Sequence, residues 1–263
     1  MTPAGVDATV PNVARIYDYL LGGKDNFEVD RKAAEALLAA APEAAVTARA
    51  NRAFLGRAVR ALAAGGVRQF LDVGAGLPTR ANVHEVARRV APDARTVYVD
   101  HDPVVVAHGR ALLSEAPGVA VVHGDLYRPE EIRADPVVQR LIDPAEPVAV
   151  LMLAVLHFVP DAADPAGLVR RLTGGLAPGS ALVLSHATSA RTREDAVATA
   201  KSVYTSAASS IELRSPAEIA RLFGAFEPTE PGVVYAPEWR PDDGEAVVQD
   251  SFLIAGVGLL PGA

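Results

Sequence analysis

The spacing of apolar residues changes along the chain at about residue 67. Before this point apolar residues recur every three or four positions, which is typical of amphipathic helices. The glycine pairs 22–23 and 65–66 end two of these segments. After residue 67, short apolar runs alternate with helical segments, so the pattern predicts a helical N-terminal part followed by an α/β unit. The predicted N-terminal helices are residues 13–21, 29–40 and 43–64.

The α/β unit predicts a parallel, doubly wound sheet, because strands joined by crossover helices at this spacing pair in parallel. Residues 148–156 form the most hydrophobic run and do not alternate, as expected of a central strand. The pattern breaks after His186, and Ser215-Pro216-Ala217-Glu218 predicts a helix start with a capping box. The predicted strands are 69–73, 96–99, 119–123, 148–156, 181–185, 233–235 and 251–259, and the remaining helices are 83–90, 104–113, 129–141 (interrupted near Pro136), 165–172, 193–207 and 215–223.

No repeat or long linker divides the 263 residues, so we expect one domain. We divide it into a helical cap (1–66), a core (67–186), and lid helices with the last two strands (187–263). Two interpretations of the cap remain: it closes over a ligand, or it only covers the sheet. We also expect residues 193–210 to form a mobile lid that selects the substrate.

Composition narrows the function classes. The net charge of −7 argues against nucleic acid as the main partner, because binding to phosphates needs an excess of Lys and Arg. There is no Cys, and the histidines lack the spacing of metal ligands, so we expect no metal site. Residues 1–11 do not resemble a secretory signal, and the longest apolar run is shorter than the ~20 residues of a membrane span. We therefore expect a cytoplasmic protein; the oligomeric state is left open.

The chemistry is concentrated at three successive strand ends. Gly74 and Gly76 follow the first strand, where a ligand can approach the bare backbone and the N–H groups of the next helix point the same way. Asp100 ends the second strand, where a carboxylate can accept from both hydroxyls of a ribose. Asp125 ends the third and can accept from the amine of adenine, beside the backbone N–H of Leu126. Each aspartate alone is equally explained as a turn residue, but together they favour a nucleotide site.

Two cofactor classes use this arrangement. A dinucleotide fingerprint needs Gly or Ala where Thr79 stands, behind the bulky Pro78. Asp72, just before the turn, favours a cationic cofactor such as S-adenosylmethionine, which carries a sulfonium and an amino group. A nicotinamide-dependent oxidoreductase is the alternative among enzymes. A non-catalytic protein that binds S-adenosylmethionine is the alternative outside them.

These motifs resemble those of class I S-adenosylmethionine-dependent methyltransferases, on residues 72–76, Asp100, 124–126 and 176–180. Nearly the whole chain is similar to a bacterial S-adenosyl methyltransferase group formerly labelled a domain of unknown function. The resemblance implies a Rossmann-like sheet of seven strands with an antiparallel last strand, and a cofactor at the carboxyl ends of the strands. The segments that carry the similarity to the bacterial group are 14–27, 49–55, 154–161, 184–187 and 239–241.

The resemblance also implies a role for each candidate residue. Gly74, Ala75 and Gly76 would face the methionine part of the cofactor, Asp100 the ribose, His101 the adenine face, and Asp125 and Leu126 the adenine edge, with Ala154 and Val155 near the sulfonium. From the cap, we expect Tyr17 and Arg52 to contact the cofactor, and Tyr19, Asn26 and Asn51 are further polar candidates there. His157 is the candidate general base, with a structural histidine as the alternative. We expect methyl transfer from S-adenosylmethionine to a small-molecule O or N acceptor, which the resemblance does not identify.

Overall fold

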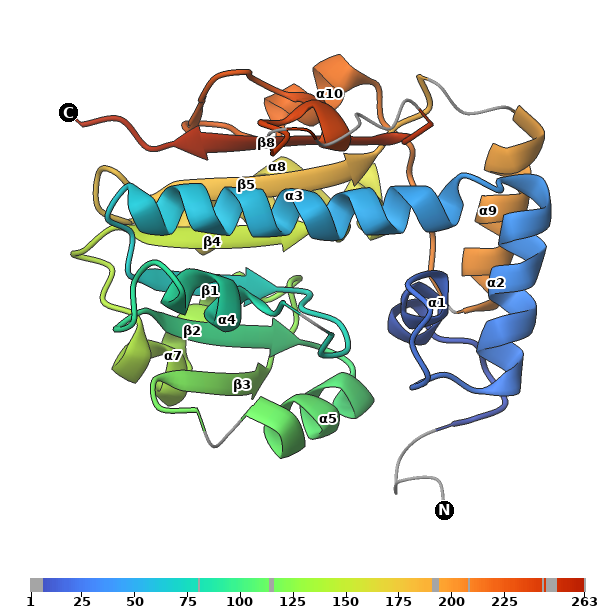
Figure 1. The fold of residues 1–263 in the computed structure, drawn as a ribbon, viewed down its shortest axis with the longest axis horizontal. Coiled ribbons are helices and arrows are strands. Elements are labelled where there is room, and N and C mark those ends of the chain that lie inside the picture. Colours follow the sequence, from blue (N-terminus) through green and yellow to red (C-terminus); the bar gives the residue numbers. More distant parts are fainter. Residues whose placement is uncertain are drawn as a thin grey trace.

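The computed structural model describes residues 7–79, 81–113, 116–190, 194–207, 209–242, 244 and 250–262. A sheet lies between two layers of helices, and a separate group of helices stands beyond one end of the sheet (Figure 1). The strands are β1 (Gln69–Val73), β2 (Arg95–Asp100), β3 (Val119–His123), β4 (Val148–Leu153), β5 (Ala181–Ala187), β6 (Glu227–Pro228), β7 (Val234–Tyr235) and β8 (Leu253–Leu259).

The α-helices follow the expected alternation with the strands. Three parts of the sequence-based predictions lie outside the described residues. They are Arg193 at the start of the expected helix 193–207, Ala208 in the expected lid, and residues 1–6 of the segment searched for a secretory signal. The α-helices are α1 (Val13–Leu20), α2 (Glu28–Ala40), α3 (Ala44–Ala64), α4 (Val83–Arg88), α5 (Pro103–Leu113), α6 (Pro129–Ala134), α7 (Pro136–Leu141), α8 (Pro165–Thr173), α9 (Glu194–Ser206) and α10 (Pro216–Arg221), and the 3₁₀ turns are η1 (Leu156–Phe158), η2 (Asp161–Ala163) and η3 (Ala236–Glu238).

The sheet order is β3-β2-β1-β4-β5-β8-β6, and β7 also pairs with β8. Strands β1 to β5 are parallel, and β8 runs antiparallel to β5. The predicted doubly wound sheet and its antiparallel last strand are therefore confirmed. The described residues form eight strands rather than seven, because the two-residue segment β6, which contains Pro228, adds a short edge pairing to β8. The division of the chain into cap, core and lid stays a prediction.

One predicted strand ends earlier than expected, and the predicted break in one helix is confirmed. Strand β4 is central and fully buried, as expected, but it ends at Leu153 instead of residue 156. The chain leaves the sheet there because Ala154 takes a left-handed conformation, with φ of 56°, before η1 begins. The interrupted helix at 129–141 is confirmed as α6 and α7, which meet at Asp135; its side chain accepts from the first amides of α7.

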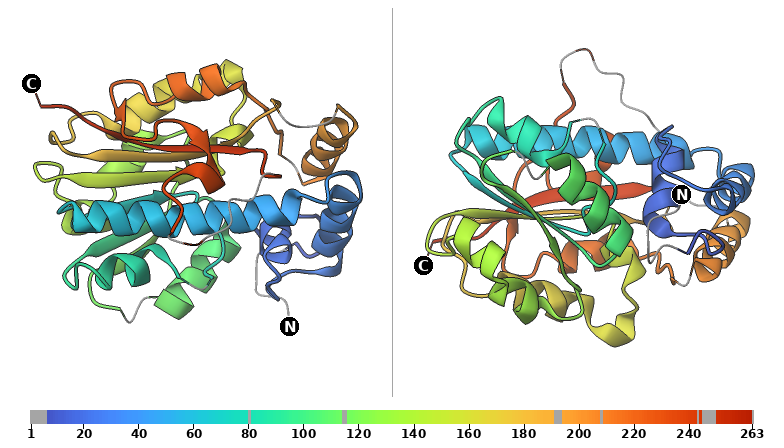
Figure 2. Two further views of the ribbon diagram at one scale, coloured as in Figure 1. Left: turned by 45° about the horizontal axis from the view of Figure 1, so that its top comes forward. Right: turned by 90° about the horizontal axis from the view of Figure 1, so that it is seen from below.

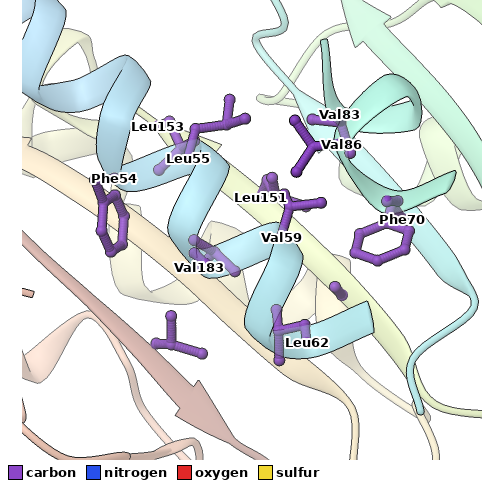
Figure 3. Close-up of a cluster of buried hydrophobic side chains, with 14 of the residues drawn as sticks. Phe54, Leu55, Val59, Leu62, Phe70, Val83, Val86, Leu151, Leu153 and Val183 are labelled. Atoms are coloured by element: carbon purple, nitrogen blue, oxygen red, sulfur yellow. The ribbon is translucent and has the colours of Figure 1, made fainter. Parts of the chain in front are cut away.

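The core lies on both faces of the sheet. Helix α3 crosses one face, where Phe54, Val59 and Leu62 pack with Leu151 of β4 and Val183 of β5 (Figure 3). Helices α7, α8 and α10 cover the other face, so the sheet is buried on both sides (Figure 2). With its 21 residues α3 is about 31 Å long. It extends beyond the strand ends, and its first turns belong to the group of helices there (Figure 1).

This group consists of α1, α2, α9 and the start of α3, and it stands at the carboxyl ends of the parallel strands (Figures 1 and 2). From here on we call it the cap, so the term now includes α9, which the sequence assigned to the lid. Ile16, Leu37 and Val203 contribute to its apolar cluster. Its polar centre is Asp30, which is fully buried and accepts from Nε of Arg15 at 2.7 Å. The backbone amides of Asn12 and Phe27 donate to the same carboxylate. An apolar cluster and a buried ion pair with two backbone hydrogen bonds therefore hold the cap together in front of the strand ends.

None of the described helices is long and apolar enough to cross a membrane.

Candidate functional site

A cavity of about 770 Å³ lies between the carboxyl ends of the strands and the cap. Its volume is within the range of roughly 300–1,000 Å³ typical of small-molecule sites. Of the further polar candidates, Asn51 lines the cavity, whereas Tyr19 and Asn26 are not among its lining residues. Other cap residues, such as Leu20 and Leu37, line it as well, so the cap forms one wall of the cavity, as expected if it closes over a ligand. The thirteen residues predicted to bind the cofactor or act in catalysis all line this cavity: Tyr17, Arg52, Asp72, Gly74, Ala75, Gly76, Asp100, His101, Asp125, Leu126, Ala154, Val155 and His157.

The turn after β1 depends on glycine at two positions. Gly74 has a φ of 72°, and a Cβ there would collide with the side chain of Val155. Gly76 has a φ of 66°, and a Cβ there would meet no atom within 4 Å. The first glycine therefore allows the loops after β1 and β4 to touch. The second leaves bare backbone beside open space.

The amides of the turn after β1 bond within the protein and do not form a phosphate cradle. Gly74 N and Ala75 N both donate to the carbonyl of Val99, at 2.8 and 3.2 Å. Gly76 N donates to Oδ2 of Asp100 at 2.9 Å. Helix α4 begins only at Val83, so its N-terminus is separated from the turn. The amides of residues 74–76 are thus used within the protein, unlike those of a dinucleotide site.

Asp100 links the first two strand ends. Its Oδ2 receives the amide of Gly76, and its Oδ1 receives the amide of Asp102 at 2.9 Å. Burial raises the pKa of Asp100, and the two amide hydrogen bonds oppose that rise. The neighbouring His101 side chain is 80% exposed, which leaves its ring at the rim of the cavity. A carboxylate oxygen can accept two hydrogen bonds, so Asp100 retains capacity for a ligand hydroxyl.

At the end of the third strand, too, an aspartate accepts a backbone amide and lines the cavity. Asp125 is half-buried, and its Oδ1 accepts from the amide of Tyr127 at 2.9 Å. Leu126, the next residue, is buried and also lines the cavity. Asp125 and Leu126 therefore offer a second carboxylate oxygen and an apolar surface to the same space as Asp100.

The cavity is strongly acidic at the end formed by the carboxyl ends of β1, β2 and β3. Burial raises the pKa of Asp72 to about 7; the Arg52 guanidinium opposes the shift, and Asp100 adds to it. Arg52 is the only Lys or Arg among the described lining residues, and it also donates to the carbonyl of Ala81 at 3.1 Å. An excess of carboxylates favours a cationic ligand over a pyrophosphate. The lining carboxylates are Asp18, Asp72, Asp100, Asp102 and Asp125.

A chain of hydrogen bonds connects the end of β4 to the cap. The amide of Ala154 donates to Oγ of Ser185 at 2.9 Å, and this hydroxyl donates to Oδ1 of Asn51 at 2.7 Å. Nδ2 of Asn51 donates to the Tyr17 hydroxyl at 2.9 Å, which donates to the carbonyl of Ala48 at 3.2 Å. We call this chain the cap-to-sheet network. It links Tyr17 on α1, through Asn51 and Ser185, to the turn at Ala154.

His157 follows this turn and is buried. The amide of Ala187 donates to its Nδ1 at 3.3 Å, so the neutral ring carries its hydrogen on Nε2. Burial, together with His186 and Arg214, lowers the pKa of His157 well below its usual value. The ring is neutral at pH 7 and offers a donor at Nε2. It has no free lone pair with which to take a proton.

Sequence analysis missed two residues that hold these loops. Arg214 is buried and donates to the carbonyls of Leu156 and Val159, which flank His157, and to Nε2 of His186 at 2.8 Å. Asn12 donates to Oδ2 of Asp102 at 2.5 Å and joins the start of α1 to the loop after β2. Neither residue stands in a motif or a periodic pattern that would have revealed it.

The sheet topology and the acidic cavity at its strand ends define a Rossmann-like protein with the fold of class I methyltransferases. The same fold is seen in human N-acetylserotonin methyltransferase, solved with S-adenosylmethionine (14% identity, TM-score 0.51, 98% of this chain and 61% of that chain). The S-adenosyl methyltransferase family model matches residues 1–261. The chain therefore belongs to the S-adenosyl methyltransferase family.

Two solved bacterial structures are similar over nearly their full length. One is a candidate methyltransferase from Thermobifida fusca (41% identity, TM-score 0.93, 99% of this chain and 98% of that chain). The other is a DUF574 family protein from Streptomyces avermitilis (38% identity, TM-score 0.91, 97% of this chain and 99% of that chain). A search of curated proteins finds no match. The predicted enzyme class and cofactor, S-adenosylmethionine, are confirmed by the family; the acceptor is not identified by these comparisons.

Proposed function

We propose that the protein transfers the methyl group of S-adenosylmethionine to a small-molecule O or N acceptor inside the cavity beneath the cap. The observation that carries this proposal is the composition of the cavity wall. Carboxylates line the ends of β1, β2 and β3, and mainly apolar residues of the cap line the opposite end. One space can thus hold the cofactor and an acceptor together.

The described residues fit the cofactor. The surplus of carboxylates suits its two positive charges, and Asp72 is buried where it can balance one of them. We assign Gly74, Ala75 and Gly76 to the methionine part and Asp100 to the ribose. Asp125, Leu126 and His101 are assigned to adenine, Ala154 and Val155 to the region of the sulfonium, and Arg52 to the carboxylate. S-adenosylmethionine supplies the reactive methyl group.

The protein contributes orientation and exclusion of water. The cap covers the strand ends, and the cap-to-sheet network fixes the turn at Ala154 against α1 and α3. Holding two reactants in a productive geometry accounts for about 7–11 kcal/mol of a barrier. We propose that His157 orients the acceptor through Nε2–H, because its Nδ1 is occupied by the Ala187 amide. This replaces the expected role of general base.

The test is a methyl-transfer assay on a metabolite extract with isotopically labelled S-adenosylmethionine. We expect label in at least one small molecule, together with release of S-adenosylhomocysteine, in the presence of the protein only. Calorimetry with S-adenosylmethionine, S-adenosylhomocysteine and NAD accompanies it, and only the first two should bind. Binding of the cofactor without any labelled product, across extracts from several sources, would contradict catalysis and favour a binding module.

A further inference from the structure

We propose that the acceptor is a neutral, largely apolar molecule of about the size of one or two aromatic rings. It would bind in the cap end of the cavity, which we call the acceptor chamber and define by Leu37, Phe158, Ala200, Tyr204, Ile211 and Phe252. This inference rests on the proposed function, and it adds the chemical class of the substrate.

The first support is the distribution of charge around the cavity. Every carboxylate of the described lining belongs to α1 or to the strand ends of β1, β2 and β3, and Arg52 faces Asp72 on the same side. The described lining residues of α2, α9, η1 and the segments 209–213 and 252–253 include no Asp, Glu, Lys or Arg. A charged acceptor would be buried there without a partner, which is strongly unfavourable.

The second support is an aromatic wall that runs from the sheet to the lid helix. The ring of His157 lies 4.4 Å from that of Phe158, and Phe158 lies 5.0 Å from Tyr204 of α9, both edge to face. His186 packs behind this wall, 5.5 Å from His157, and is fully buried and not among the described lining residues. Rings of this kind favour a flat apolar ligand, which they can contact face or edge on.

The third support is the kind of polar group that the chamber offers. Tyr17 and Asn51 already bond within the cap-to-sheet network. His157 offers Nε2–H and is uncharged, because burial disfavours its charged form and His186 and Arg214 beside it also oppose a positive charge. A neutral N–H matches a neutral oxygen or nitrogen of the acceptor. Leu37 and Ile211 contribute buried apolar surface, and the other polar side chains of these lining segments are the uncharged Tyr204, Ser209 and Ser210.

The test compares two fluorescent probes with the same ring skeleton. 1-Naphthylamine is neutral at pH 7, and 5-aminonaphthalene-1-sulfonate is the same two-ring molecule with one added sulfonate. The full chain is first saturated with S-adenosylhomocysteine, as verified by calorimetry. We expect the neutral probe to bind one to one, with a Kd at least tenfold lower than that of the sulfonate. Equal affinities, or no saturable binding of the neutral probe, would overturn the inference.

Three substitutions on α9 test whether the neutral probe binds in the acceptor chamber. Ala200→Phe fills the chamber and should weaken the neutral probe at least tenfold, while the affinity for S-adenosylhomocysteine changes less than twofold. Ala198→Phe, the same change at an exposed position of the same helix, should alter neither affinity. Tyr204→Lys places a cation in the chamber and should lower the ratio of the two Kd values, sulfonate probe over neutral probe, at least threefold. An unchanged preference in a folded Tyr204→Lys protein, or equal effects of the two alanine substitutions, would overturn the assignment.

These results separate the two proposals. Failure of S-adenosylhomocysteine to bind the parent protein would contradict the proposed function. Normal binding of S-adenosylhomocysteine, combined with failure of the probe comparison, would contradict only the acceptor class.

Discussion

The backbone amide of Gly76 donates to Oδ2 of Asp100 over 2.9 Å, so one carboxylate both shapes the turn after β1 and faces the cavity after β2. Asp100→Ala should therefore weaken S-adenosylhomocysteine binding about tenfold or more, since hydrogen bonds to a charged group contribute about 1.5–3 kcal/mol. Calorimetry measures the affinity, and circular dichroism verifies the fold. Asp93→Ala, a change at an exposed aspartate, is the control. An affinity equal to that of the control would remove Asp100 from the cofactor site.

Asp72 should make cofactor binding depend on pH. Its pKa is raised to about 7 in the protein, so near neutral pH part of the population holds a proton there. A cationic ligand favours the ionised form, so binding should release a proton and the affinity should rise with pH through about 7. Calorimetry in buffers of different ionisation enthalpy counts the protons. Asp72→Asn should abolish both effects; a pH dependence that persists in this variant would assign it to another group.

The same carboxyl should lower stability at high pH. Its folded-state pKa of about 7 lies above the unfolded value of 3.8, so between about pH 4 and 7 the folded protein holds a proton that the unfolded chain has lost. The free energy of unfolding therefore falls as pH rises through this window. Without ligand, Asp72→Asn should be more stable than the parent at pH 8, by on the order of 2–4 kcal/mol. Urea denaturation at pH 8 and pH 4 measures the difference, which should vanish at the lower pH.

His157 offers a way to distinguish a donor from a base. His157→Ala should leave S-adenosylhomocysteine affinity unchanged and slow methyl transfer. His157→Gln, whose amide can donate but cannot take up a proton, should recover a substantial part of the rate. The parent rate should also show no histidine titration between pH 5.5 and 8, because burial lowers the pKa of His157 well below 6.5. A glutamine variant as slow as the alanine variant would restore the role of base, if the parent rate at saturating S-adenosylmethionine also follows a pKa in this range that both variants lose.

The Asp30–Arg15 pair should be essential to the cap. Asp30→Ala leaves Nε of the buried Arg15 and two backbone amides without their acceptor, and loss of one partner of a buried pair costs about 3–5 kcal/mol. Urea denaturation measures the loss, and limited proteolysis shows whether cleavage begins in residues 7–40. Glu28→Ala breaks an exposed pair with Lys32 on the same helix and should leave the urea midpoint unchanged. Equal midpoints for the two variants would show that Asp30 is dispensable.

The parts of the fold that were predictable from the sequence are those fixed by local patterns. Strands β1 and β3 begin and end at the expected residues, because each is a short apolar run followed directly by a glycine. Strand β6 was missed, because two residues carry no period, and one of them is Pro228. The end of β4 was placed too late, since the apolar run continues through Ala154 and Val155 although the backbone has already turned.

The candidate residues of the site were predictable where they stand at strand ends. Their supports were not, because the bonded partners lie far apart in the sequence. Ser185 and Asn51 are separated by 134 positions, and Asn12 and Asp102 by 90. One signal was present and unused: Ser185 stands in a fully buried apolar strand, where a hydroxyl requires a partner. The direction of the amides after β1 was also beyond sequence patterns, because it depends on the carbonyl of Val99 in the neighbouring strand.

Helix α9 contributes Ala196, Ala200 and Tyr204 to the cavity wall but no member of the cap-to-sheet network and no carboxylate. Substitutions confined to α9 can therefore change the wall of the proposed acceptor chamber without removing a carboxylate of the cavity or a hydrogen bond of the cap-to-sheet network.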